Sequence, residues 1–108
     1  MLVAEANGEI IGYICYGPTP MTDNTWDIYW VVVSSERRKM GIGSKLLKLA
    51  EELITNAKGR IVIIETSSTK AYKNTVRFYL NHKYITIGLI PDFYKPGDDK
   101  LILEKKLR

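Results

Sequence analysis

The sequence predicts an α+β fold, in which a mixed, largely antiparallel sheet of about six strands carries two main helices and one parallel βαβ crossover. Two observations support this prediction. Asn7-Gly8 separates two apolar runs, and Asn-Gly between such runs is a strong hairpin signal because both turn residues need positive φ. Across 26–65, an apolar run, a helical pattern and a second apolar run follow one another, which is the order of a βαβ unit.

The hairpin strands are expected over 2–6 and 9–16. The second run, from Ile10 to Tyr16, is apolar on both faces, which is typical of a central strand. A loop is expected at 17–24, where prolines and polar residues cluster. The opening run has no proline to blunt its edge, and two helices cannot cover both faces of such a sheet. The sequence therefore predicts an exposed apolar sheet face that favours a homo-oligomer.

The βαβ unit is expected to have a strand over 26–33, a helix from about 41 to 58 and a strand over 60–65. Simple alternation along the first strand puts three side chains on one face: Ile28, Trp30 and Val32. The helix carries an apolar stripe of Ile42, Leu46, Leu49, Ala50, Leu53, Ile54 and Ala57. Gly59 follows at the position where a C′ glycine ends a helix.

A second helix is predicted over about 70–81, because the polar stretch Thr66–Thr69 before it offers N-cap side chains. Two late strands are expected at 84–89 and 100–107, joined by a connection rich in turn residues. No internal repeat, low-complexity tract or linker interrupts the chain. Residues 1–108 are therefore predicted to form a single domain.

Composition limits the function classes. The 108 residues are 45% hydrophobic and 26% charged, which is ordinary for a globular domain. Sixteen basic residues exceed 12 acidic ones, but they are interspersed, and no stretch interleaves aromatic and basic residues as a nucleic-acid platform would. The lone Cys15 lies in an apolar strand pattern and is expected in the core. No apolar run is long enough for a membrane span and no signal peptide is visible, so a cytoplasmic location is expected.

The stretch from Val31 to Ser44 predicts an anion site. A buried strand leads into a basic turn and then into a helix that begins near Gly41 and Gly43. A helix N-terminus offers free N–H groups and the positive end of the dipole, and glycine lets a ligand approach the backbone. Three basic residues at 37–39 add charge, so the most plausible ligand is a phosphate group.

Two common phosphate motifs do not match. A dinucleotide fingerprint needs a third glycine at the position of Leu46. A nucleotide P-loop needs Gly-Lys-Ser or Gly-Lys-Thr, whereas this chain has Gly43-Ser44-Lys45. What Arg38-Lys39-Met40-Gly41-Ile42-Gly43 resembles is the Arg/Gln-x-x-Gly-x-Gly/Ala signature of the GNAT-type N-acetyltransferases.

Two further segments are similar to this family. Tyr72–Tyr84 resembles its second signature, with Phe78-Tyr79 at the core of the motif. The family's usual asparagine falls at Tyr72 and its usual glycine at Lys83, so the match departs from the pattern at both positions. The ending 91–100 followed by an apolar strand is also similar to members of the family. The resemblance therefore covers about 1–108 and implies the GNAT fold.

The resemblance implies that the chain binds acetyl-coenzyme A as a cosubstrate. In this family the loop and helix start hold the pyrophosphate, and the edge of the preceding strand pairs with the pantetheine amides. The same strand offers an N–H to the thioester carbonyl. The implied cofactor-binding residues are Val31, Val32, Val33, Arg38, Lys39, Met40, Gly41, Ile42, Gly43 and Ser44.

The implied reaction is acetyl transfer to a primary amine by direct attack. Tyr79 matches the tyrosine of the second signature and is the implied general acid, since a phenol with a pKa of about 10 stays protonated at neutral pH. Packing in the helix core is the alternative for this residue. Glu65 and Asp27 lie where family members carry a carboxylate, and either is a candidate general base, with Glu65 ranked first. No cluster has metal-ligand spacing, so no metal is expected.

Other function classes stay open. Family members normally have another strand and two helices before the hairpin, which form one wall of the acceptor cleft. A non-catalytic acyl-coenzyme A-binding or regulatory module is therefore the first alternative. A basic nucleic-acid-binding domain that uses 37–39 and Arg60 is the second. The acceptor amine, whether a small molecule or a peptide, is not defined by the sequence.

Overall fold

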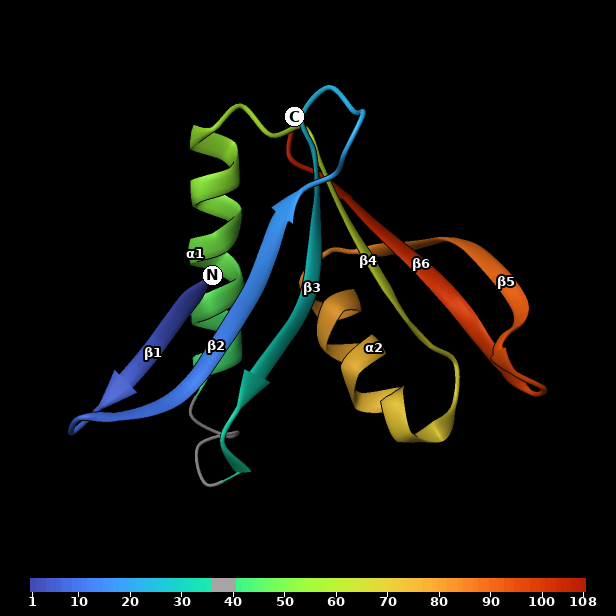
Figure 1. Ribbon diagram of the computed structural model, residues 1–108, viewed down its shortest axis with the longest axis horizontal. Helices are drawn as coiled ribbons and strands as arrows, with labels where there is room; N and C mark the ends of the chain where they lie inside the picture. Colours follow the sequence, from blue (N-terminus) through green and yellow to red (C-terminus); the bar gives the residue numbers. More distant parts are fainter. Residues whose placement is uncertain (36–40) are drawn as a thin grey trace. The chain divides into compact units, whose positions relative to one another are not determined.

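The computed structural model describes residues 1–35 and 41–108 (Figure 1). Their elements, in chain order, are β1 (Leu2–Ala6), β2 (Glu9–Pro18), β3 (Thr25–Val33), α1 (Ile42–Asn56), β4 (Ile61–Ser67), the short 3-10 helix η2 (Lys70–Tyr72), α2 (Lys73–Asn81), β5 (Ile85–Lys95) and β6 (Asp98–Lys106). The strand order is β1-β2-β3-β4-β6-β5. This order confirms the predicted mixed sheet with six strands, one parallel pair and two helices.

The chain divides into two compact units. The first comprises Met1–Val62 with Leu107–Arg108, and the second comprises Ile63–Lys106. Strand β4 begins in the first unit and continues in the second. The single domain expected over 1–108 stays a prediction.

The first unit is built on the predicted hairpin. Asn7 and Gly8 have φ values of 53° and 82°, so both turn positions are left-handed as the sequence required. β1 pairs with β2, and β2 with β3, both antiparallel. Helix α1 lies against β1, β2 and β3 (Figure 1), and the core between them includes the fully buried Ile14 and Leu47.

A bulge in β3 makes the predicted alternation along this strand wrong. Trp30 lies opposite Cys15, but Ile28 lies opposite Tyr16, so Tyr29 is an extra residue on β3. The side chains on the two sides of the bulge therefore point to opposite faces. Ile28 is 3% exposed and faces the core, whereas Trp30 is 51% exposed.

The sheet face that carries Trp30 is apolar and exposed. Val32 is on the same strand two residues later, and Val3 lies on β1; they are 41% and 42% exposed. The sequence anticipated such a face, although it attributed it to Ile10–Tyr16 alone. A homo-oligomer that covers it stays a prediction.

The buried side of α1 differs from the predicted stripe. Its buried residues are Ile42, Leu46, Leu47, Ala50, Glu51 and Ile54. Leu49 and Leu53, which were expected to be buried, are 45% and 39% exposed. The helix faces the sheet through a narrower set of positions than its apolar stripe, and Leu47 occupies that contact in their place.

Helix α1 ends in a Schellman motif whose C′ residue is a lysine. Lys58 has a φ of 67°, and its N–H donates to the carbonyl of Thr55 at 2.9 Å. The N–H of Gly59 donates to the carbonyl of Ile54 at 2.8 Å. The predicted C′ glycine was therefore wrong by one residue, because Lys58 takes the left-handed position.

Helix α2 ends in the same way. Lys83 has a φ of 75° and donates to the carbonyl of Leu80 at 3.2 Å, while Tyr84 donates to the carbonyl of Tyr79 at 3.1 Å. Lys83 is the position where the resembling family usually has glycine. A left-handed C′ residue is the physical reason for that preference.

Replacing Lys58 or Lys83 with glycine is expected to raise the free energy of unfolding by about 1 kcal/mol each, because a left-handed backbone strains every residue with a Cβ. Urea unfolding measures the change. Lys48→Gly, at an exposed position within α1, is the matched control. It is expected to lower the free energy of unfolding by about 1 kcal/mol. Destabilisation by all three replacements would contradict the assignment of the helix ends.

The second unit differs from the sequence-based expectation at the start of its helix and in the length of its first hairpin strand. Neither η2 nor α2 has a side-chain cap, so the capping role predicted for Thr66–Thr69 is wrong. Strand β5 continues through Pro91 to Lys95, where a connection was expected. Proline is tolerated there because β5 is the outermost strand in the order.

Candidate functional site

The N-terminus of α1 has the features of an anion site. Gly41 is the N-cap residue, with a φ of 73°, and its carbonyl accepts the N–H of Lys45 at 3.1 Å. Among residues 1–35 and 41–108, no side-chain hydrogen bond caps this end, and the first turn contains no acidic residue. A Cβ placed on Gly41 would meet no described atom within 4 Å. These features favour an anion at this end of the helix.

Three of the predicted cofactor-binding residues, Arg38, Lys39 and Met40, lie outside the described residues. Gly41, Ile42, Gly43 and Ser44 lie at the start of α1, in the order that the sequence predicted. Ile42 is buried against the first unit's core, so only its backbone is available to a ligand.

The three valines of β3 differ in where their backbone groups point. The N–H of Ser34 donates to the carbonyl of Ile11 at 2.8 Å, which makes this a hydrogen-bonded pair of the β2–β3 ladder. Because such pairs alternate along an antiparallel ladder, Val32 directs its N–H and C=O toward β2. Val31 and Val33 direct theirs toward the other side of β3, which is the side of β4 in the strand order.

Tyr79 lies at the end of α2 in a cluster of aromatic rings. It is 4% exposed, and its ring centroid is 5.2 Å from that of Phe78 and 5.6 Å from that of Tyr84. The contact between Tyr79 and Tyr84 is the hydrophobic contact that commonly accompanies a Schellman motif. Burial raises the pKa of Tyr79 to about 12.

Ionisation of Tyr79 should make the protein less stable in alkali. Its pKa is raised from 10.0 to about 12 on folding, so its contribution is complete below pH 10 and is lost as the pH rises through 12. The loss is on the order of 2–3 kcal/mol at most. Comparing the unfolding free energies of wild type and Tyr79→Phe at pH 9 and 11.5 measures it. An equal dependence on pH in both proteins would contradict the burial of this phenol.

Glu65 is on β4 and forms an ion pair with Lys100 of β6. The ammonium of Lys100 also lies 4.3 Å from the centroid of the Phe93 ring. Sequence reasoning selected Glu65 but missed Lys100 and Phe93. Their proximity depends on β6 lying next to β4, and no local pattern in the sequence encodes that order.

Asp27 has a different environment, in the first unit. Its Oδ2 accepts a hydrogen bond from Oγ1 of Thr19 at 2.8 Å, and the residue lies opposite Gly17 on β2. This contact closes the loop between β2 and β3. The structure therefore gives Asp27 a role in the loop, while Glu65 and Tyr79 belong to the second unit.

A buried polar cluster in the second unit was also missed. Oγ of Ser67 donates to Oδ1 of Asp98 at 2.5 Å and lies 2.9 Å from Oγ1 of Thr69. Ser67 and Asp98 are 7% and 9% exposed. The cluster joins the end of β4 to the start of β6, so it fixes the register between these strands.

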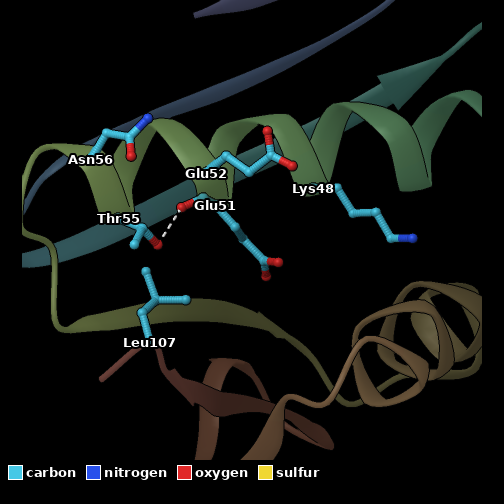
Figure 2. Close-up of a pocket in the computed structure, with 6 residues that line it drawn as sticks. All are labelled: Lys48, Glu51, Glu52, Thr55, Asn56 and Leu107. Carbon is cyan, nitrogen blue, oxygen red and sulfur yellow. Dashed lines mark hydrogen bonds between the residues drawn. The ribbon is translucent and has the colours of Figure 1, made fainter.

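A cavity of about 490 Å³ lies beside the last turns of α1 in the first unit (Figure 2). It is lined by Lys48, Glu51, Glu52, Thr55, Asn56 and Leu107. Within it, Oγ1 of Thr55 donates to the carbonyl of Glu51 at 2.7 Å. None of the predicted site residues lines this cavity, which is at the opposite end of α1 from Gly41.

Residues 1–35 and 41–108 contain no group of three His, Cys, Asp or Glu side chains that could hold a metal ion. In the same described part of the chain, no helix combines the length and the apolar character that crossing a membrane requires.

The described residues thus form a mixed α+β sheet with two helices, and α1 starts behind a left-handed glycine. The model of the acetyltransferase (GNAT) family matches residues 1–84. The chain therefore belongs to the GNAT family of acetyltransferases.

Individual relatives agree with this assignment. An uncharacterised N-acetyltransferase of Methanocaldococcus jannaschii is 31% identical over 105 residues, which are 96% of this chain and 64% of that protein. A protein assigned to the GNAT family from Desulfovibrio desulfuricans is 35% identical, with a TM-score of 0.97 over 98% of this chain and 67% of the other. An aminoglycoside 6′-N-acetyltransferase solved with coenzyme A has a TM-score of 0.82 over 98% of this chain and 71% of the other; at 21% identity, it shows the fold alone.

Proposed function

We propose that this chain binds acetyl-coenzyme A and transfers its acetyl group to a primary amine. The observation that carries the proposal is the N-terminus of α1, which has Gly41 as its N-cap and no acidic residue in its first turn, in a chain that belongs to the GNAT family. An anion at such an end is worth about 0.3–1 kcal/mol when exposed and up to about 2 kcal/mol when partly buried. Several N–H groups and the side chain of Arg38 must therefore act together to hold a pyrophosphate.

The bound coenzyme would supply an activated acetyl group and a thiolate leaving group. The backbone of 41–44 and the basic residues before it would bind the pyrophosphate. Val31 and Val33 would pair with the pantetheine amides, and an N–H of β3 would stabilise the developing oxyanion. Val32, which was also predicted for this role, directs its backbone groups toward β2, and this favours Val31 and Val33.

Tyr79 is the proposed general acid. Because its pKa is raised to about 12, the phenol is fully protonated at neutral pH and can donate a hydrogen bond to a sulfur atom. Complete transfer of its proton to a thiolate with a pKa of about 8.5 is uphill at that value. Tyr79 therefore acts first as a hydrogen-bond donor to the developing thiolate and delivers its proton late in the step.

Glu65 is the proposed general base, with Asp27 as the second candidate. Asp27 accepts a hydrogen bond from the hydroxyl of Thr19, and this bond must break before Asp27 can act as a base. Glu65 is exposed, and its contact is an ammonium group that an amine substrate could replace. This difference favours Glu65.

Calorimetry with acetyl-coenzyme A, followed by a thiol-release assay over a panel of primary amines, tests the proposal. Micromolar binding together with amine-dependent release of coenzyme A supports it. Binding without release for any amine would favour a coenzyme-binding module. No binding would exclude both functions.

A further inference from the structure

Two pairs of side chains face each other across β4 and β6. Ser67 is hydrogen-bonded to Asp98, and Glu65 is paired with Lys100. Each pair is displaced from the other by two residues on both strands, so all four side chains lie on one face of the sheet. The buried bond between Ser67 and Asp98 fixes the register that brings Glu65 opposite Lys100.

The ammonium group of Lys100 has two different partners. It forms an ion pair with the carboxylate of Glu65. It also lies 4.3 Å from the centroid of the Phe93 ring, within the range of a cation–π interaction. The side chain of Lys100 is 16% exposed, whereas that of Glu65 is 44% exposed. A carboxylate and an aromatic face that converge on the ammonium of a largely buried lysine side chain are the components of a site for alkylammonium groups.

We propose that Glu65 and Phe93 form a binding site for a primary alkylammonium group, which the side chain of Lys100 occupies in the structure. The inference rests on the proposed function and names its acceptor class: an amine on an unbranched aliphatic chain, like that of lysine. Such an amine would reach Glu65 from the exposed side of the carboxylate and place its ammonium where that of Lys100 lies. An acceptor with a carboxylate beside its amine is disfavoured, because Glu65 repels it.

Removing the ammonium of Lys100 tests the inference. Lys100→Met removes the ammonium and keeps an unbranched side chain. We titrate this variant with n-butylammonium chloride and follow the resonances of the Phe93 ring by NMR. We expect binding about tenfold tighter than in the control Lys106→Met, which removes the same charge from an exposed position on β6. n-Butanol, which has no charge, is expected not to bind, and Lys100→Met with Glu65→Gln is expected to lose the gain.

Butylammonium binding to Lys100→Met that is no tighter than to Lys106→Met would overturn the inference. Lys100→Gln repeats the test if the methionine variant does not fold, and failure of both to fold would show that the lysine is indispensable to the strand pair, which also overturns it. Acetyl-coenzyme A binding is measured on the same variants. If the variants bind acetyl-coenzyme A but no amine, only the acceptor site is rejected. If the wild-type protein does not bind acetyl-coenzyme A, the proposed function is rejected.

Discussion

Replacement of Tyr79 with phenylalanine is expected to lower kcat by about 10²–10⁴-fold, the usual contribution of a positioned acid, while affinity for acetyl-coenzyme A changes little. The hydroxyl is the only group removed, and the ring contacts with Phe78 and Tyr84 are kept. Steady-state thiol release with an active amine measures kcat, and calorimetry measures affinity.

Tyr84→Phe is the matched control, because it removes a hydroxyl from the same ring cluster at a position with no proposed role in catalysis. A structural role for Tyr79 would alter stability and leave kcat and its dependence on pH unchanged. That result would show that the hydroxyl of Tyr79 has no role in catalysis.

Replacement of Gly43 with valine is expected to weaken acetyl-coenzyme A binding by at least about 100-fold. Gly43 is the second residue of α1, where N–H groups and the positive end of the dipole face the proposed pyrophosphate. A branched side chain there would occupy the approach of the phosphate. Calorimetry measures the affinity, and thermal unfolding shows whether the fold is kept.

Leu49→Val introduces the same β-branched residue at an exposed position of the same helix. It is expected to bind the coenzyme like wild type. Equal affinities for the Gly43 variant and this control would exclude the start of α1 as the phosphate site.

The parts of the fold that the sequence predicted are local. Asn7-Gly8 forms its turn because both residues tolerate positive φ, and the start of α1 follows from a pattern within a few residues of Gly41. The bulge at Tyr29 was not predictable in this way, because it depends on how β3 pairs with a strand about fifteen residues earlier. The left-handed lysines were missed because glycine is the usual signal for that conformation.

The candidate site shows the same difference between local motifs and contacts that depend on the strand order. The helix start was predicted as a site from a continuous motif, and Tyr79 from a second one; both stay predictions. The partners of Glu65 were not found, because Phe93 and Lys100 reach it only through the adjacency of β4 and β6. Burial of Tyr79 was one of the two alternatives that the sequence left open, because the ring contact with Tyr84 depends on how the chain leaves the helix.

The bulge in β3 also gives the protein two distinct fluorophores. Trp26 and Trp30, the two tryptophans of the chain, are four residues apart and would share one face of a regular strand. The extra residue Tyr29 separates them: the indole N–H of Trp26 is buried, whereas Trp30 is half exposed. Iodide should therefore quench the emission of Trp30 and spare that of Trp26, so anything that covers this face of β3 can be followed by the quenching of native fluorescence, without a label.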